Sequence, residues 1–147
     1  MIKNIIVKPI EFETIKQYWI EVDHFKDPNK RIEEIIKTLG PHITQELNPR
    51  RIAYGLFNND MLIGATQLVH WSDNLIRYRT INIRSEYRGK DLGWYLLETA
   101  WNLDWIGQGN LFGWVRDTHY DWAIKHNFTE MDKHWTGDHI AMSRVMP

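Results

Sequence analysis

The sequence contains no cysteine among its 147 residues. Disulfides, thiolate metal sites and a cysteine nucleophile are therefore excluded. The sequence also has no excess of charge of either sign, because 18 lysines and arginines stand against 19 acidic residues. This balance argues against a general nucleic-acid-binding surface, so no nucleic-acid partner is expected.

Long hydrophobic runs are absent as well. The apolar run within residues 1–9 is too short for a secretory signal, and no later run could span a bilayer. We therefore expect a cytoplasmic protein with no membrane partner. None of the seven histidines forms a pair or cluster at ligand spacing, so no metal site is predicted. No repeat or linker is visible, and residues 1–147 are predicted to form a single domain.

The hydrophobic pattern predicts both strands and helices. Strands are expected at residues 2–8, 51–57, 61–71, 75–83, 110–115, 127–133 and 139–145. Helices are expected at residues 11–25, 31–39, 90–106 and 118–126. Pro9 is expected to close the first strand, and the helix over residues 90–106 is apolar on nearly every side, which is typical of packing on both flanks. The fold class is therefore predicted as α+β (mixed α/β), with a mostly antiparallel sheet and about four helices.

The most informative stretch is the turn between the strand that ends at Ile83 and the next helix. It contains Arg88, Gly89, Lys90 and Gly93. A strand that leads through a basic, glycine-containing turn into a helix presents unpaired backbone N–H groups at the positive end of the helix dipole. This construction suits an anion, above all a phosphate.

Two common phosphate-binding loops do not match this turn. A Walker loop would require serine or threonine after Gly89-Lys90, where the chain has Asp91. A dinucleotide-binding fingerprint would require three glycines near the first strand, and this turn has two glycines deep in the chain. The pattern that remains is Arg-x-x-x-x-Gly, from Arg88 to Gly93.

Residues 83–93, Ile-Arg-Ser-Glu-Tyr-Arg-Gly-Lys-Asp-Leu-Gly, resemble the coenzyme A pyrophosphate loop of the GNAT superfamily of N-acetyltransferases. That motif runs Arg/Gln-x-x-Gly-x-Gly/Ala. Residues 116–128 are similar to the family's segment from strand five to helix four, which usually ends in Tyr-x-Lys-x-Gly-Phe. The two blocks occur in the family's order, and the predicted elements match that order over nearly the whole chain.

The resemblance implies a fold in which two parallel strands splay apart with acyl-coenzyme A in the gap. It implies acetyl-coenzyme A as cosubstrate and a primary amine, of a small molecule or a peptide, as acceptor. The pantetheine arm would pair with the strand edge near Ile81 and Ile83. The amine would attack the thioester directly, with a backbone N–H stabilising the oxyanion. The pyrophosphate would be bound by the loop residues Arg88, Gly89, Lys90, Asp91, Leu92, Gly93 and Trp94.

Three positions depart from the family pattern. Asp91 replaces the first motif glycine, and we expect its carboxylate to point outward because an aspartate suits a first helical turn. Ala123 stands where the family usually has the tyrosine that protonates the leaving thiolate. Tyr120, one turn earlier, is a candidate replacement, with a packing role as the alternative. Arg77 stands where many relatives have a glutamate base, a role that arginine cannot fill near neutral pH.

Other candidates lie on the neighbouring strands. Arg77 and Arg79 share one face with Ile81 by the two-residue strand period, and they would suit a carboxylate on the substrate. The alternative is a solvent-exposed basic stripe. His70 is the candidate for a base acting through water, although such a histidine is more often an ordinary surface or core residue. Arg84 is a further candidate for a phosphate contact.

The leading hypothesis is an N-acetyltransferase that uses acetyl-coenzyme A. Its rival is a non-catalytic acyl-coenzyme A binding or sensing module, because Ala123 and Arg77 remove both usual proton-transfer groups. A nucleotide-binding structural domain ranks last, since it explains the turn and leaves residues 116–128 unexplained. The sequence predicts neither the acceptor nor the oligomeric state.

Overall fold

The computed structural model describes residues 4–22, 50–72, 74–136 and 139–147, with residues 132–136 described through their backbone. The described strands form one mixed sheet in the order β1-β2-β3-β4-β5-β7-β6. Their bounds are β1 Ile5–Ile10, β2 Arg51–Asn58, β3 Met61–Ser72, β4 Leu75–Ile83, β5 Asn110–Arg116, β6 Thr129–Thr136 and β7 His139–Arg144. The described helices are α1 Phe12–Glu21, α3 Leu92–Asp104 and α4 Tyr120–Lys125, with short 3-10 turns η1 Ser85–Tyr87 and η2 Asp117–His119. The helix predicted at residues 31–39 lies outside the described residues.

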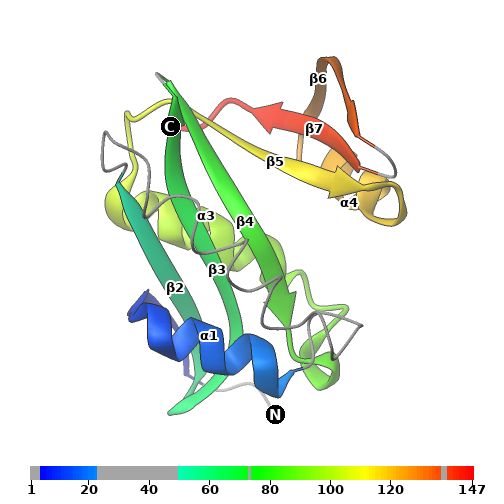
Figure 1. Ribbon diagram of the computed structural model, residues 1–147. Helices are drawn as coiled ribbons and strands as arrows, with labels where there is room; N and C mark the ends of the chain where they lie inside the picture. Colours follow the sequence, from blue (N-terminus) through cyan, green and yellow to red (C-terminus); the bar gives the residue numbers. More distant parts are fainter. Residues whose placement is uncertain (1–3, 23–49, 73, 137–138) are drawn as a thin grey trace.

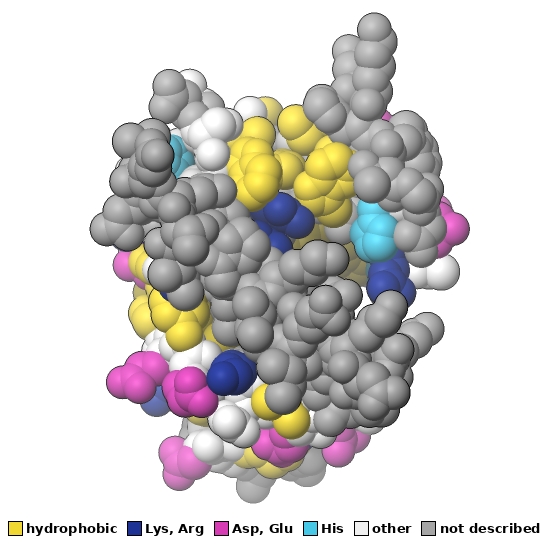
Figure 2. Space-filling model, in the orientation of Figure 1, with side chains coloured by type: hydrophobic (Ala, Val, Ile, Leu, Met, Phe, Trp, Pro, Cys, Tyr) yellow, Lys and Arg dark blue, Asp and Glu magenta, His cyan; other side chains and the backbone are white. Residues whose placement is uncertain are grey.

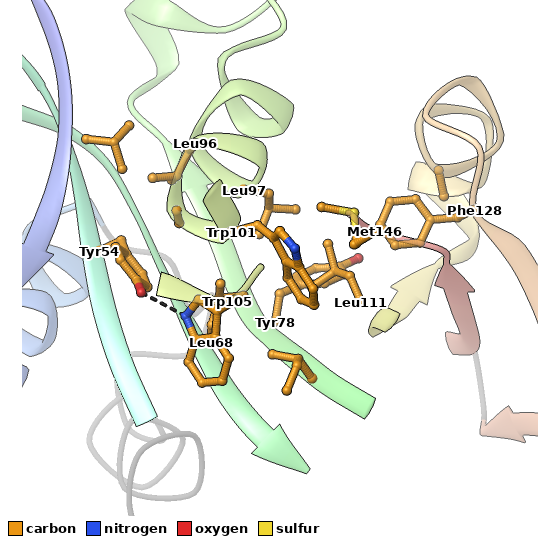
Figure 3. Packing of buried hydrophobic residues seen from close by; sticks show 14 of the residues in the cluster. Tyr54, Leu68, Tyr78, Leu96, Leu97, Trp101, Trp105, Leu111, Phe128 and Met146 are labelled. Atoms are coloured by element: carbon orange, nitrogen blue, oxygen red, sulfur yellow. Dashed lines mark hydrogen bonds between the residues drawn. The ribbon is translucent and has the colours of Figure 1, made fainter. Parts of the chain in front are cut away.

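The helices cover both faces of the sheet. Helix α1 crosses one face over β2 and β3, and α3 lies on the opposite face (Figure 1). Beneath α3 the larger core gathers aromatic and aliphatic side chains, including three fully buried tryptophan and tyrosine rings: Trp101, Trp105 and Tyr54 (Figure 3). Trp105 Nε1 donates to the Tyr54 hydroxyl at 2.8 Å, and that hydroxyl donates to Asp104 Oδ2 at 2.7 Å. No helix in the described part of the chain is long and apolar enough to cross a membrane.

Most predicted elements are confirmed, with differences at their ends. The hairpin turns form where the sequence places them, because Asn59 and Asn74 accept positive φ angles of 55° and 62°. The prediction that Pro9 closes the first strand is wrong, since β1 continues to Ile10. Proline is tolerated there because β1 lies at the edge of the sheet formed by the described strands, where it pairs with β2 alone. Helix α3 is packed less completely than predicted, since Leu103 is 51% exposed.

The feature that positions the site is the parallel pair β4 and β5. The two strands pair only from Leu75 to Arg77 on β4 and from Asn110 to Phe112 on β5. Beyond these residues each strand continues without pairing to the other, and the two visibly diverge (Figure 1). We refer to the opening between the diverging strands as the wedge. The predicted pair of splayed parallel strands is confirmed.

Candidate functional site

The loop from β4 to α3 opens beside the wedge. The first bond within α3 runs from Tyr95 N–H to Asp91 O, at 3.2 Å. The N–H groups of residues 92–94 therefore have no acceptor within the helix, and they carry the positive end of its dipole. Arg88 and Lys90 are exposed beside them, and Arg88 Nε donates to Ile83 O at 2.8 Å. This backbone arrangement suits a phosphate group.

Arg84, at the start of the loop, is directed away from these N–H groups. Its Nε donates to Leu62 O at 2.7 Å, and its Nη2 lies 2.7 Å from Glu21 Oε1. Glu21 is the last residue of α1. Arg84 therefore ties α1 to the loop, which explains its position better than a phosphate contact would.

Gly93 lies in the first turn of α3, where glycine is less favourable than alanine by about 1 kcal/mol. Among the described residues, a Cβ added at Gly93 would touch only Ile81 Cγ2, at an ordinary contact distance of 3.6 Å. The packing of the described residues therefore does not require a glycine here. Gly89 differs, because its φ of 80° itself favours glycine. Without a side chain, Gly93 allows a bound group to approach the start of the helix closely.

Asp91 adopts the left-handed conformation, with φ 61° and ψ 25°. A motif glycine would suit this position for its backbone conformation as well as for close approach of a ligand. The carboxylate is turned toward the end of α4, where Oδ1 lies 2.8 Å from His126 Nε2 and Oδ2 lies 3.9 Å from Lys125 Nζ. The negative charge of Asp91 is thus partly balanced from α4.

His126 connects the start of α3 to the end of α4. Its ring stacks on Trp94, with ring centroids 5.0 Å apart and an interplanar angle of 17°. Arg144 Nη1 donates to His126 O at 2.9 Å, and its guanidinium lies 4.5 Å from the centre of the Trp94 ring. Because His126 is 8% exposed, these contacts are largely shielded from water. They hold the loop, α4 and β7 in one arrangement.

A bulge interrupts β4 within the wedge. Ala65 pairs with Asn82 and Gln67 pairs with Arg79, so β4 carries one more residue than β3 over this interval. The extra residue is Thr80, whose φ of 52° is unusual for a β-branched residue. The bulge changes the side-chain alternation. Ile81 packs against the α3 core, so the prediction that it shares a face with Arg77 and Arg79 is wrong.

Tyr78 fills the narrow end of the wedge on the α3 side. A Cβ at Gly113 on β5 would overlap the Tyr78 ring, so glycine at position 113 makes room for this side chain. The ring also meets Phe128 edge-on, with centroids 6.1 Å apart. Burial raises the pKa of Tyr78 above its usual value, and the hydroxyl remains protonated at neutral pH.

Three half-buried arginines lie on the α1 face of the sheet. Arg51 on β2 and Arg77 on β4 flank Val69 in the same cross-strand row, and Arg79 pairs with Gln67 in the next row. We call Arg51, Arg77 and Arg79 the arginine cluster. Burial lowers the pKa of each, and for Arg79 the charges of Arg77 and Arg51 add to this, giving a pKa of about 10.

The predicted proton-transfer residues are not brought together. His70 pairs with Ile76, whose side chain lies in the α3 core, so His70 belongs to the face opposite the arginine cluster. Tyr120 lies at the start of α4, and its hydroxyl donates to Glu130 Oε2 at 2.9 Å. This hydrogen bond raises the pKa of Tyr120. Ala123 is fully buried in the α3 core.

Several residues at the site were missed by sequence reasoning. Gln67 gave a visible signal, because it is the polar residue within the apolar run of β3. Arg51 could have been found only through the register that aligns it with Val69 and Arg77. The pairing of Asp91 with His126 joins residues 35 positions apart, and local sequence carries no sign of it.

Several solved structures to which this chain is similar are acetyltransferases. The chain is similar to the PaiA N-acetyltransferase of Thermoplasma acidophilum in complex with coenzyme A, with a TM-score of 0.71 and 16% identity over 98% of this chain and 100% of that one. It is also similar to an acetyltransferase from Thermus thermophilus, with a TM-score of 0.70 and 15% identity over 99% of each chain. It is similar as well to an aminoglycoside 6'-N-acetyltransferase complexed with coenzyme A, with a TM-score of 0.67 and 12% identity over 97% of this chain and 98% of that one. No protein-family model matches the chain, and no curated protein matches it in sequence.

At these identities the likeness establishes the fold. The chain has the GNAT fold, as the α+β pattern and the two sequence blocks predicted.

Proposed function

We propose that this protein is an N-acetyltransferase that transfers an acetyl group from acetyl-coenzyme A to an amine. The observation that carries the proposal is the continuity of the wedge with the loop. In the described part of the chain, no strand pairs with β4 beyond Arg77 on the side of β5, and the same strand leads directly into the turn where the first N–H groups of α3 have no acceptor within the helix. An extended arm ending in a pyrophosphate matches this surface along its length.

The residues present fit coenzyme A. Near Ile81 and Ile83, where no described strand pairs with β4 on the side of β5, backbone groups would pair with the amides of the pantetheine arm. The N–H groups of residues 92–94 would receive the pyrophosphate, and the lack of a side chain at Gly93 would allow it to approach closely. Arg88 and Lys90 add positive charge at the rim of the loop.

The bound thioester would supply an activated acetyl group. The acceptor nitrogen forms a bond to the carbonyl carbon, and the carbon–sulfur bond then breaks to release the coenzyme A thiolate. The nitrogen loses a proton to solvent. Backbone N–H groups beside the Thr80 bulge are no longer held in a regular ladder, and they would stabilise the oxyanion by several kcal/mol.

Tyr120 is expected to contribute little to this chemistry, because its hydroxyl proton is directed to Glu130. Tyr120→Phe should lower kcat by less than about threefold, whereas loss of a working general acid costs about 10²- to 10⁴-fold. A thiol has a reference pKa of about 8.5 and leaves without much help. Steady-state kinetics with acetyl-coenzyme A would measure the change, with Tyr95→Phe on the exposed side of α3 as control. A hundredfold loss specific to Tyr120→Phe would assign it the acid role.

Asp91→Asn should strengthen coenzyme A binding about two- to fivefold at low salt. Asparagine tolerates the left-handed conformation and keeps a hydrogen-bonding partner for His126, while one negative charge beside the loop is removed. Two unit charges about 8 Å apart in water interact by about 0.5 kcal/mol, and by more near a protein surface. Titration calorimetry at two ionic strengths would show the gain shrinking with salt. Glu13→Gln, at an exposed position of α1, is the control. If Asp91→Asn and the wild type bind coenzyme A with equal affinity, the pyrophosphate lies elsewhere.

A second function, non-catalytic binding or sensing of acyl-coenzyme A, is supported by a specific observation. Tyr120 is bonded to Glu130, Ala123 is buried, and His70 lies on the opposite face from the arginine cluster. The described residues therefore leave the acid and base positions of the resemblance unfilled. This function would share the coenzyme site and lack turnover.

The two functions are separated by one pair of measurements. Acetyl-coenzyme A at about 100 times its Kd should stabilise the protein by about 2.7 kcal/mol, and ATP should not. Free thiol is then measured with an amine panel, and the absence of cysteine means that every thiol detected comes from coenzyme A. Thiol release that depends on the amine supports the transferase, whereas binding without release supports the sensing module. Absence of binding would contradict both.

A further inference from the structure

We infer that the acceptor of this reaction carries an acidic group, a carboxylate or a phosphate, in addition to its amine. The arginine cluster and Gln67 would bind that group on the α1 face of the sheet. The inference rests on the proposed function, because it assigns the acceptor side of the same wedge. Four observations support it.

The first observation is the position of the arginine cluster relative to the wedge. Arg79 directly precedes the bulge residue Thr80, beside the open part of the wedge. A strand rises by about 3.3 Å per residue, which places the Arg77 backbone about 7 Å further along β4. Arg51 faces the same side, since its guanidinium lies 3.8 Å from the centre of the Phe12 ring of α1. A small acceptor could therefore place its amine at the wedge and its acidic group at the cluster.

The second observation is a set of buried polar atoms. Gln67 is fully buried, and neither its Oε1 nor its Nε2 has a hydrogen-bond partner among the described residues. Arg77 Nε is buried and unpartnered in the same sense. Leaving such groups without partners is costly in an empty protein. An oxyanion would accept from Arg77 Nε and from the Gln67 amide, leaving the Gln67 carbonyl to accept from a donor group of the same ligand.

The third observation is charge. Burial, and then the charges of Arg77 and Arg51, lower the pKa of Arg79. An acidic group placed beside these half-buried guanidinium groups would form charge-assisted hydrogen bonds with them. An acceptor that carries further positive charges would gain no such bonds.

The fourth observation is a rigid aromatic support. The Arg77 guanidinium lies 5.0 Å from the centre of the Trp71 ring, and Trp71 meets Phe112 edge-on at 5.9 Å. This contact fixes Arg77 before a ligand arrives and reduces the entropy lost on binding. Figure 2 shows basic side chains in the upper middle of this face, with hydrophobic ones above them.

The test measures acceptor binding to the coenzyme A-loaded protein by calorimetry. The probes are phenylalanine, 2-phenylethylamine, 2-aminoethyl phosphate and spermidine. Phenylalanine should bind about 10- to 100-fold more tightly than 2-phenylethylamine, the range that charge-assisted hydrogen bonds provide. Phenylalanine and 2-aminoethyl phosphate distinguish a carboxylate from a phosphate. Equal or tighter binding of 2-phenylethylamine or spermidine, or no binding of either acidic probe, would overturn the inference.

Variants of the arginine cluster and of Gln67 test whether these residues bind the acidic group. Arg77→Gln and Arg79→Gln should each remove at least tenfold of the affinity for the acidic probe, with unchanged affinity for coenzyme A. Arg116→Gln, at the exposed end of β5, is the matched control. Gln67→Leu should weaken the acidic probe while raising the melting temperature, because it removes two unpartnered buried atoms. A purely structural role for Gln67 would leave the probe affinity unchanged.

The failures of the two proposals are distinguishable in the same samples. Loss of coenzyme A binding by the wild type would remove the proposed function and this inference together. Coenzyme A binding and thiol release with neutral amines, without preference for acidic ones, would remove only the inference. Retained preference in Arg77→Gln and Arg79→Gln would also contradict it, because the acidic group would then be bound elsewhere.

Discussion

Gly93→Ala is expected to weaken coenzyme A binding at least tenfold while making the unliganded protein more stable. Alanine replaces glycine in the first turn of α3, which favours the helix by about 0.5–1 kcal/mol. Among the described residues the added methyl meets only Ile81, at 3.6 Å, so no strain from them offsets this gain. The same methyl would occupy the space that the pyrophosphate needs at the start of α3, and it should push the phosphate out of hydrogen-bonding distance.

The expected result is specific because affinity for coenzyme A falls while the stability of the unliganded protein rises. Titration calorimetry measures the affinity, and thermal unfolding should show a rise of about 2–3 °C. Asn102→Ala, at an exposed position of α3, is the control, because it raises helix stability away from the loop. If Gly93→Ala stabilises the protein and leaves affinity intact, the pyrophosphate does not lie at this turn. A fall in the melting temperature would instead contradict the inference that a methyl group at position 93 causes no strain.

Gly113→Ala is expected to lower the free energy of unfolding by about 1–3 kcal/mol. The new Cβ overlaps the buried ring of Tyr78, and a side chain in a closely packed core can move only at a cost of this size. Gly113 lies on β5 just beyond the paired segment, so the ring would be displaced into the wedge. Chemical denaturation measures the change, and weaker coenzyme A binding should accompany it.

A double-mutant cycle tests the cause. Tyr78→Val removes the ring atoms that Gly113→Ala would meet, at the cost of a cavity. In the Tyr78→Val background Gly113→Ala should be nearly neutral, which gives a coupling energy similar to the single-mutant loss. Additive losses would mean that β5 requires glycine at position 113 for some reason other than the Tyr78 ring.

The fold was largely predictable because its signals are local. The bounds predicted for the strand over residues 75–83 are those of β4, and the asparagines at the hairpin turns accept positive φ as expected. The order of strand, loop, helix and strand predicted the parallel pair of β4 and β5. Helix α3 is shorter than predicted, since Asp91 before it adopts positive φ and Trp105 after it leaves the helical conformation with φ −124°. The segment at residues 23–49 lies outside the described residues.

The site was less predictable because it depends on register. The one-residue bulge at Thr80 turned Ile81 away from the arginine face, and a two-residue period cannot anticipate such a shift. Pro9 was misjudged because the sequence does not reveal that β1 is an edge strand. Arg51 lies in line with Arg77 because β2 pairs with β3 and β3 pairs with β4, and the sequence does not reveal these registers. Each of these features is a property of the sheet as a whole.

The bulge at Thr80 has a consequence for the unliganded protein. Among the described residues, no strand pairs with β4 beyond Arg77 on the side of β5, and a strand edge without a strand partner can recruit a strand from another chain and begin aggregation. Thr80 breaks this edge into two segments of three residues or fewer, at 78–79 and 81–83, with different side-chain phases. A regular foreign strand cannot follow both segments at once. The irregularity that prepares β4 for a flexible ligand arm therefore also protects the empty protein from association with its own copies.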